Sequence, residues 1–202
     1  MNNLQDLKMN SMLGMITIVL FLFSCSNEES SIDIYCNNSL DFDTQVVDHS
    51  DFDFTIDIPA NWIWKVEDYQ NENFIMVMNA SSKPDKNGYI DMIAIQKVKS
   101  LGGNEDLESE FNYLLSISKE QTEYHLVIAG SGKTNILKYD SYFIHTKPQT
   151  GMKGALESIE FILESKSKGT FYYLHAGASQ TDNLVKNMSI IIACFKTFEL
   201  IN

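Results

Sequence analysis

The stretch Phe52-Asp53-Phe54-Thr55-Ile56-Asp57-Ile58-Pro59 decides the fold class of this chain. Apolar side chains alternate with polar ones through it without a break, which predicts a half-buried β-strand. Pro59 lacks a backbone N–H and ends that strand. Because one face of such a strand must be covered, we expect a sheet that packs against a hydrophobic core.

The rest of the chain repeats the strand signal. Further strands are expected at residues 74–78, 89–98, 125–129, 134–137, 141–145, 156–164 and 170–175. A turn at Lys86-Asn87-Gly88 joins the first two of these strands, since Asn-Gly is a strong hairpin signal. Connections of hairpin length dominate, so the sheet is predicted to be mostly antiparallel and the fold class α+β.

Two helices are predicted, one between the strands and one after them. Apolar residues recur at helical spacing between Asn104 and Gln121, with Asn104 as the N-cap and acidic residues in the first turn. The second helix follows Ser179-Gln180-Thr181-Asp182, which has the spacing of a capping box. Its apolar residues from Leu184 onward fall on one face, which predicts that the helix packs on the sheet.

The segment Phe54-x-Ile56-x-Ile58-Pro59-x-x-Trp62 is similar to the opening strand of the PsbP-like family. That family is named for an extrinsic photosystem II subunit and includes a Ran-binding import factor and many bacterial lipoproteins. The order of hairpin, helix, strand pair and terminal helix also resembles the family, as does the closing Cys194-Phe195, over roughly residues 50–200. The resemblance implies a curved, mostly antiparallel sheet flanked by two or more helices, no catalytic motif, and action mainly by binding other proteins.

The N-terminal region resembles a lipoprotein signal peptide. Residues 12–23, MLGMITIVLFLF, form an apolar run that is too short to span a bilayer, which needs about 20 residues. A buried helix of the domain is the alternative, but the ending Leu22-Phe23-Ser24-Cys25 resembles a lipobox, whose Cys receives the lipid. We therefore predict a signal peptide at residues 1–24, lipid on Cys25, a flexible tether at residues 25–45 and one domain at residues 46–202.

The residues after Cys25 bear on the cellular location. Ser26-Asn27-Glu28-Glu29 resembles the acidic surface-export signal of lipoproteins from the Bacteroidetes, although a solvated tether is equally compatible with these residues. Two or three acyl chains hold a protein on a membrane essentially irreversibly. We expect a membrane-anchored protein of the cell envelope, with the outer membrane preferred and the cell surface compatible.

The charge of the chain argues against some classes of partner. The formal net charge is −12, from 27 acidic and 15 basic residues, and every basic residue is Lys. An acidic protein repels polyphosphate, so no nucleic-acid partner is expected. Arg supplies the planar fork that binds phosphate with two hydrogen bonds, so its absence weakens any proposal of a phosphate-ester enzyme.

Two stretches resemble ligand sites but have simpler interpretations. One of them, Gly130-Ser131-Gly132-Lys133-Thr134, resembles the end of a phosphate-binding loop. However, Val127 replaces the first Gly of that motif, and residues 135–139 suggest a strand where the motif needs a helix. A hairpin turn is therefore predicted here. A run of carboxylates beside His49 could hold Ca²⁺, but it lacks the spacing of an EF-hand, and solvation of the outer strand face explains it. The carboxylates are Asp41, Asp43, Asp48, Asp51, Asp53 and Asp57.

Three further sets of side chains leave alternatives open. His125, His145 and His175 lie in separate strands without ligand spacing, which favours structural roles over a shared metal. Trp62 and Trp64 could form a partner-binding ridge, although core packing is favoured. An oxidising envelope permits a disulfide between Cys36 and Cys194, whereas the apolar neighbours of Cys194 favour a buried thiol.

No local spacing of a catalytic pair or triad occurs in the sequence, and no cofactor or metal is expected. The leading hypothesis is a lipid-anchored envelope protein with a non-catalytic binding domain that engages another envelope protein. One alternative is a carrier of an apolar small ligand, which requires a cavity of several hundred Å³. The other is a hydrolase whose site is assembled from distant residues.

Overall fold

The computed structural model describes residues 30–36, 42–68, 71–121, 126–149 and 154–201. The predicted signal peptide, Cys25 and the acidic segment after it lie outside these residues, as do Asp41 and His125. The folded unit begins at Ser31.

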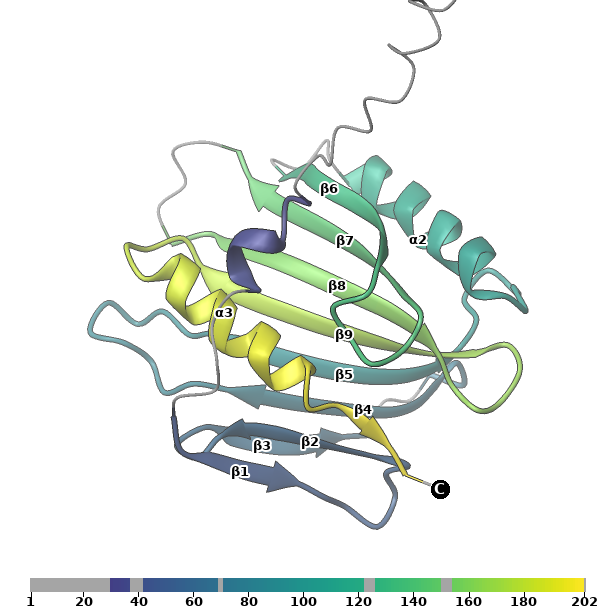
Figure 1. Cartoon of the computed structure of the whole chain (residues 1–202), viewed down its shortest axis with the longest axis horizontal. Coiled ribbons are helices and arrows are strands. Elements are labelled where there is room, and N and C mark those ends of the chain that lie inside the picture. Colours follow the sequence, from purple (N-terminus) through teal and green to yellow (C-terminus); the bar gives the residue numbers. More distant parts are fainter. Residues whose placement is uncertain (1–29, 37–41, 69–70, 122–125, 150–153, 202) are drawn as a thin grey trace, which may run out of the picture. The chain divides into compact units, whose positions relative to one another are not determined.

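Strands make up most of the folded unit. They are β1 Thr44–Val47, β2 Phe54–Pro59, β3 Ile63–Glu67, β4 Phe74–Ser81, β5 Met92–Lys99, β6 Leu126–Thr134, β7 Ser141–Pro148, β8 Leu156–Glu164, β9 Thr170–Ser179 and β10 Glu199–Leu200. The helices are the 3-10 helix η1 Asp33–Tyr35 and the α-helices α2 Leu107–Gln121 and α3 Leu184–Phe195. Seven antiparallel strands form the main sheet in the order β3-β4-β5-β9-β8-β7-β6, and a second sheet has the order β1-β2-β10 (Figure 1). The predicted α+β class with a mostly antiparallel sheet is confirmed.

The main sheet has a large core on one face and a smaller one on the other. α3, η1 and strand β2 contribute to the large core, in which Phe54, Phe161 and Phe195 are buried. On the other face, α2 covers β6, β7 and β8 and buries Phe111 and Leu114. Each fully buried Phe or Leu contributes roughly 1.5–3 kcal/mol, so the large core is the main source of stability.

The local patterns that predicted strand and turn are confirmed. In β2, Phe54, Ile56 and Ile58 are fully buried while the polar residues between them are half-buried. The hairpin between β4 and β5 turns at Gly88, which has a φ of 83° and donates its backbone N–H to the Asp85 carbonyl. Gly adopts this left-handed conformation without a steric penalty.

Both helices begin differently from the prediction. α2 begins at Leu107, and its cap is Asp106, whose Oδ1 accepts the Ser109 N–H at 2.9 Å. Asn104, the predicted cap, instead donates its side-chain amide to Glu110 at 2.8 Å. The predicted capping box before α3 is also wrong, because Ser179 is the last residue of β9 and the N-cap of α3 makes no side-chain hydrogen bond.

The Gly130-Ser131-Gly132-Lys133-Thr134 stretch is strand rather than the predicted hairpin turn. β6 runs through it, with a register shift between Ile128 and Gly130, and the turn comes at residues 135–140. The predicted strand at residues 134–137 is therefore also wrong. A Cβ at position 130 would collide with the Ser31 hydroxyl, so a Gly here permits close packing and does not mark a turn.

Part of the predicted tether belongs to the folded unit. Ile32, the N-cap residue of η1, and Tyr35, its last residue, are both buried in the large core. β1 then pairs with β2, with Thr44 opposite Pro59. Sequence patterns missed this docking because three residues of 3-10 helix have no period to detect, and the surrounding Ser, Asn and Asp residues are typical of a linker.

The two cysteines of the folded unit are free thiols, so the alternative of a disulfide is not present in the structure. Cys194 is fully buried in α3, where burial raises the pKa of its thiol to about 12. Cys36 is half-buried, and its thiol donates to the Ile32 carbonyl at 3.3 Å. The interpretation of Cys194 as a buried apolar side chain is confirmed.

Candidate functional site

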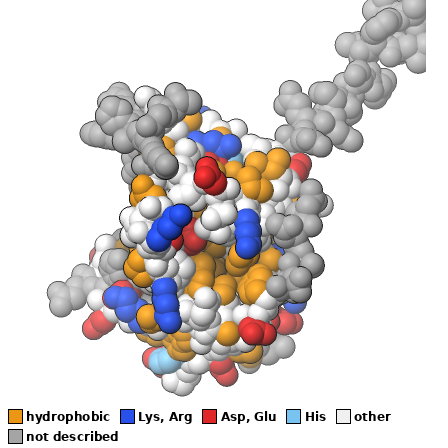
Figure 2. Space-filling view, turned by 90° about the vertical axis from the view of Figure 1, so that its left-hand side faces the viewer, with side chains coloured by type: hydrophobic (Ala, Val, Ile, Leu, Met, Phe, Trp, Pro, Cys, Tyr) orange, Lys and Arg blue, Asp and Glu red, His pale blue; other side chains and the backbone are white. Residues whose placement is uncertain are grey.

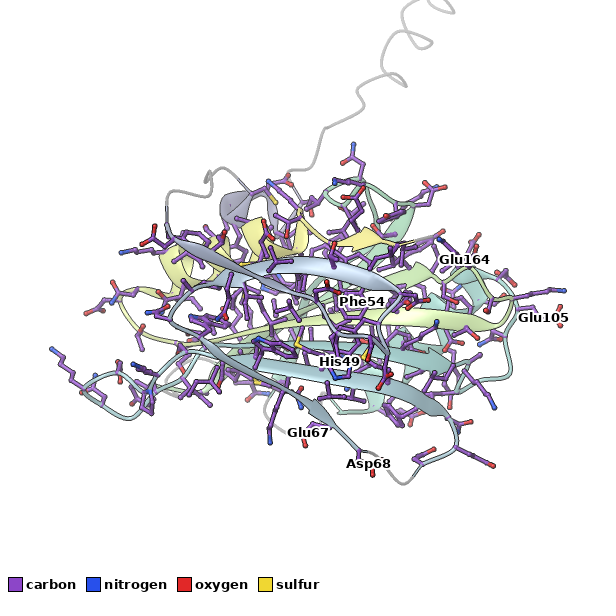
Figure 3. All side chains as sticks on the ribbon, turned by 90° about the horizontal axis from the view of Figure 1, so that it is seen from below. His49, Phe54, Glu67, Asp68, Glu105 and Glu164 are labelled. Carbon is purple, nitrogen blue, oxygen red and sulfur yellow. The ribbon has the colours of Figure 1, made fainter. Side chains whose placement is uncertain are left out.

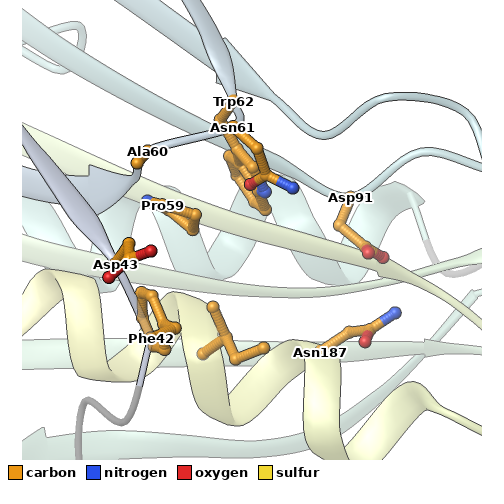
Figure 4. Close-up of a pocket in the computed structure, with 9 residues that line it drawn as sticks. Phe42, Asp43, Pro59, Ala60, Asn61, Trp62, Asp91 and Asn187 are labelled. Carbon is orange, nitrogen blue, oxygen red and sulfur yellow. The ribbon is translucent and has the colours of Figure 1, made fainter.

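A pocket of about 430 Å³ opens where β2 ends and the chain turns into β3 (Figure 4). The turn is closed by a hydrogen bond from the Trp62 N–H to the Pro59 carbonyl at 3.0 Å. The start of β5 and one face of α3 complete the walls. The lining residues are Phe42, Asp43, Pro59, Ala60, Asn61, Trp62, Asp91, Asn187 and Ile190. The pocket therefore joins segments that are far apart in the sequence.

The pocket combines apolar walls with two carboxylates. Trp62 and Phe42 contribute aromatic surface, and Asp43 and Asp91 stand on opposite sides (Figure 4). Burial raises the pKa of Asp91 above its ordinary value, against hydrogen bonds from the Ser179 backbone and the Asn187 amide, which act to lower it. No Lys or His lines the pocket among the residues that the structure describes.

Exposed apolar side chains surround this end of the main sheet. Ile63, Ile90, Leu156 and Val185 are 67%, 42%, 40% and 50% exposed. Ile63 pairs with the last residue of β4 and Leu156 with the last residue of β9, so these strand ends share one end of the sheet. Both side chains alternate with residues that face the large core, so they point to the other face of the sheet. Figure 2 shows apolar side chains gathered in a hollow on this side of the molecule, with Lys side chains around it. We call the pocket together with these four residues the pocket end.

A second group of polar side chains is buried between η1 and the main sheet. The Ser31 hydroxyl lies 3.0 Å from His145 Nδ1, and His145 Nε2 lies 2.8 Å from Glu157 Oε1. The Tyr35 hydroxyl donates to the same Glu157 oxygen at 2.5 Å. We call Ser31, Tyr35, His145 and Glu157 the N-terminal clasp, because they join the start of the folded unit to β7 and β8.

The clasp has the residue types of a hydrolytic triad but not the surroundings of one. His145 and Glu157 are 0% and 1% exposed, and both ring nitrogens of His145 are engaged. Burial by itself would raise the pKa of Glu157, but hydrogen bonds from His145 and Tyr35 and the charge of Lys147 hold it below its ordinary value. The close approach of Ser31 to Gly130 leaves no space for a substrate beside its hydroxyl. The geometry fits the docking of a segment rather than acyl transfer.

The other predicted candidates are dispersed over the molecule. Among the described residues, no group of three or more His, Cys, Asp or Glu could hold a metal ion. His175 lies 3.8 Å from Glu160 on the α2 face of the sheet, away from His145 on the opposite face. In the acidic run, Asp43, Asp48 and Asp51 are exposed, but Asp53 accepts hydrogen bonds from Lys97 and Tyr172. Figure 3 labels His49, which lies beside this run, and Phe54, the first residue of β2.

The two tryptophans do not form an exposed ridge. Trp62 is 9% exposed and belongs to the large core, and Trp64 packs against the same core from β3. The favoured interpretation of core packing is confirmed, although Trp62 also lines the pocket. Sequence reasoning missed Glu157 entirely. The alternation along β8 could have indicated its burial, because Glu157 falls on the same face of the strand as Ile159 and Phe161.

Comparison with known proteins identifies the fold. No family model and no curated protein matches the sequence. Among solved structures, the Ran-binding protein Mog1p of Saccharomyces cerevisiae superposes with a TM-score of 0.55 at 7% identity, over 80% of this chain and 97% of that protein. The cyanobacterial PsbP protein of Synechocystis sp. PCC 6803 gives 0.54 at 8% identity, over 78% and 92%. The chain has a PsbP-like fold.

LpqN of Mycobacterium tuberculosis, a protein involved in cell envelope biogenesis, has the same PsbP-like fold. It gives a TM-score of 0.52 at 12% identity, over 79% of this chain and 91% of its own. At these identities the likeness concerns the fold alone, because one fold serves many functions. The fold that the opening strand and the order of elements suggested is confirmed.

Proposed function

We propose that this protein is a lipid-anchored protein of the cell envelope whose folded unit binds another envelope protein through the pocket end, without catalysing a reaction. The observation that carries this proposal is an open pocket with aromatic walls at one end of the sheet, where Ile90 and Val185 are also exposed. A pocket with apolar walls and exposed apolar side chains near it is typical of protein–protein contact sites, in which a few anchors carry most of the binding energy.

The PsbP-like fold supports a protein partner. Mog1p, with the same fold, is a Ran-binding protein, and LpqN takes part in cell envelope biogenesis. In the N-terminal clasp, where Ser31, His145 and Glu157 meet, both ring nitrogens of His145 are already engaged and Glu157 is buried. Binding is therefore the activity that the exposed surface supports best.

The lipid anchor rests on the sequence of the N-terminal region. The lipobox-like Leu22-Phe23-Ser24-Cys25 places the thiol shortly before Ser31, where the folded unit begins. Within the described part of the chain, no helix is long and apolar enough to cross a membrane. Acylation of Cys25 supplies the attachment, and the composition without Arg and the acidic segment after Cys25 favour the outer membrane.

A carrier of an apolar small ligand is the second candidate, because the pocket volume of about 430 Å³ lies in the range of small-molecule sites. Asp43 and Asp91 in the lining make this candidate weaker, since an apolar ligand would cover both carboxylates without supplying a hydrogen bond or a positive charge. Mass spectrometry of the purified protein under native conditions distinguishes the two. A stoichiometric apolar molecule that co-purifies with the protein would favour the carrier.

The experiment that tests protein binding compares two matched variants of the full lipidated chain. Ile90→Glu places a charge on the pocket end, and Ile75→Glu places the same charge on β4 at the opposite end, at similar exposure. We expect Ile90→Glu to weaken capture of the envelope partner from native membranes about tenfold, which corresponds to about 1.4 kcal/mol, and Ile75→Glu to leave it unchanged. Equal capture by both variants would contradict the assignment of the surface.

The anchor has its own test. Cys25→Ala removes the thiol that receives the lipid, so the variant is expected to accumulate as an unlipidated precursor or to leave the membrane. Labelling with a radioactive fatty acid measures this, and Cys36→Ala serves as the matched control because Cys36 lies in the folded unit. Label that stays on the Cys25→Ala variant would overturn the lipobox assignment.

A further inference from the structure

The chemistry of the pocket indicates what part of a partner enters it. Its walls combine the aromatic faces of Phe42 and Trp62 with the aliphatic surface of Pro59 and Ile190. Such walls accept a chain of methylene groups, and the face of a Trp also attracts a cation. An occupant with an aliphatic stem therefore fits the apolar part of the lining.

The polar part of the lining requires a donor of hydrogen bonds with positive charge. Asp43 and Asp91 approach from opposite sides, and no basic side chain of the described residues lies between them (Figure 4). The Asn187 amide group donates to Asp91, which leaves the Asn187 carbonyl oxygen as a free acceptor. The lining thus presents hydrogen-bond acceptors on more than one side. One of them, the Asp91 carboxylate, is half-buried and has no cationic partner among the described residues.

We propose that the pocket binds the side chain of a lysine residue of the partner protein, with the ammonium group beside Asp91 and the Asn187 carbonyl oxygen and the stem against Trp62 and the other apolar walls. This inference rests on the proposed function in that it takes the partner to be a protein. An ammonium group is compact and has three donors, which suits acceptors on separate sides. A guanidinium group is a planar fork that prefers both oxygens of one carboxylate, whereas Asp91 already accepts hydrogen bonds from the Ser179 backbone and the Asn187 amide.

Two features of the surroundings support a cationic occupant. Burial of Asp91 disfavours its charged form in the free protein. An ammonium group beside it would stabilise the carboxylate and offset this cost of burial. The net charge of −12 also attracts cations from a distance. The Lys side chains outside the hollow in Figure 2 do not line the pocket, and they favour a partner with an acidic surface around its lysine.

The test uses two small probes that differ only at the end of the side chain. Nα-acetyl-lysine N-methylamide carries the ammonium group, and Nα-acetyl-norleucine N-methylamide has the same four side-chain carbons, the last of them a methyl group, without the ammonium group. NMR titration of the folded chain follows the Trp62 indole N–H and the Asn187 amide. We expect the lysine probe to bind at least tenfold more tightly than the norleucine probe, with shifts confined to the pocket.

Matched variants complete the test. Asp91→Asn is expected to remove the tenfold preference for the lysine probe, whereas Asp140→Asn, which removes an exposed carboxylate from the β6–β7 turn, is expected to preserve it. Unchanged resonances away from the pocket show that each variant is folded. Equal binding of the two probes, a preference for norleucine, or shifts outside the pocket would each overturn the proposal. Because this titration needs no partner, its outcome is independent of the capture experiment with Ile90→Glu.

Discussion

Glu157, the second residue of β8, and Asp91, the residue before β5, are carboxylates at the same end of the sheet, yet their surroundings are opposite. Glu157 is 1% exposed and accepts hydrogen bonds from Tyr35 and Gln180, with His145 and Lys147 also within reach. Asp91 lies in an open pocket and has only polar backbone and amide donors. Accordingly, the pKa of Glu157 is lowered and that of Asp91 is raised.

The difference separates a structural site from a binding site. A buried carboxylate whose oxygens are saturated by the protein stabilises the folded state and has nothing left to offer a ligand. A carboxylate that is desolvated without a cationic partner costs stability and gains from a ligand that supplies the charge. On this argument the N-terminal clasp holds the chain together, and the pocket is available for recognition.

The largest expected effect comes from breaking the clasp. Glu157→Gln keeps the shape of the side chain but removes the charge that His145, Tyr35 and Lys147 face, so we expect the free energy of unfolding to fall by about 3 kcal/mol. Urea denaturation measures the change. Glu160→Gln, on the same strand but partly exposed, is the control and is expected to cost less than about 1 kcal/mol. Similar losses for the two variants would mean that the clasp has no special role.

The pH dependence sharpens the comparison, because the two carboxylates act in opposite directions. The lowered pKa of Glu157 means that its stabilisation is present above its ordinary value of 4.5 and is lost as the pH falls through the lowered pKa. The raised pKa of Asp91 means that its contribution is present below its ordinary value of 3.8 and is lost as the pH rises through the raised pKa. The Glu157→Gln variant should therefore be less stable than the unsubstituted protein near neutral pH, and this difference in the free energy of unfolding should disappear in acid.

Asp91→Asn should behave in the opposite way, gaining stability relative to the unsubstituted protein as the pH rises from acid towards neutrality. Urea denaturation at a series of pH values measures both differences. Parallel pH profiles for the two variants would contradict the contrast between the sites.

A smaller effect is expected at the edge of the clasp. Ser31→Ala removes one hydrogen bond to His145 and leaves the contacts of Ile32 and Tyr35 in place, so the free energy of unfolding should fall by about 1 kcal/mol. Amide hydrogen exchange should show faster exchange at η1, while exchange at the pocket stays the same. Ser50→Ala, at an exposed position between β1 and β2, is the control. Faster exchange at the pocket in the Ser31→Ala variant would show that the two regions are coupled.

The parts of the fold that the sequence predicts are those with a local repeat. The alternation in β2, the Asn-Gly turn before β5 and the apolar faces of α2 and α3 each occupy one continuous stretch, so their period is visible without knowledge of the tertiary structure. The prediction of local structure is wrong where one residue type is typical of two different structures. Gly130 is an example, since its small size is needed for the approach of Ser31 across the sheet rather than for a turn.

The site could not be predicted in the same way, because long-range contacts create it. The pocket takes Phe42 from before β1, Trp62 from the β2–β3 turn, Asp91 from the start of β5 and Asn187 from α3. No sequence spacing links these residues, which come together only because β2 and α3 lie against each other in the folded chain. The sequence did predict that Trp62 packs in the core, but it contains no sign that one side of the indole borders a pocket.

The measurement that tests the central claim most directly is site-specific photo-crosslinking in the native envelope. A photoreactive amino acid at position 90 lies on the pocket end, and the same amino acid at position 75 lies at the opposite end with similar exposure. We expect a discrete crosslinked partner protein from position 90 of the full lipidated chain and none from position 75. The same adduct from both positions, or an adduct from position 75 alone, would contradict the assignment of the pocket end as the binding surface.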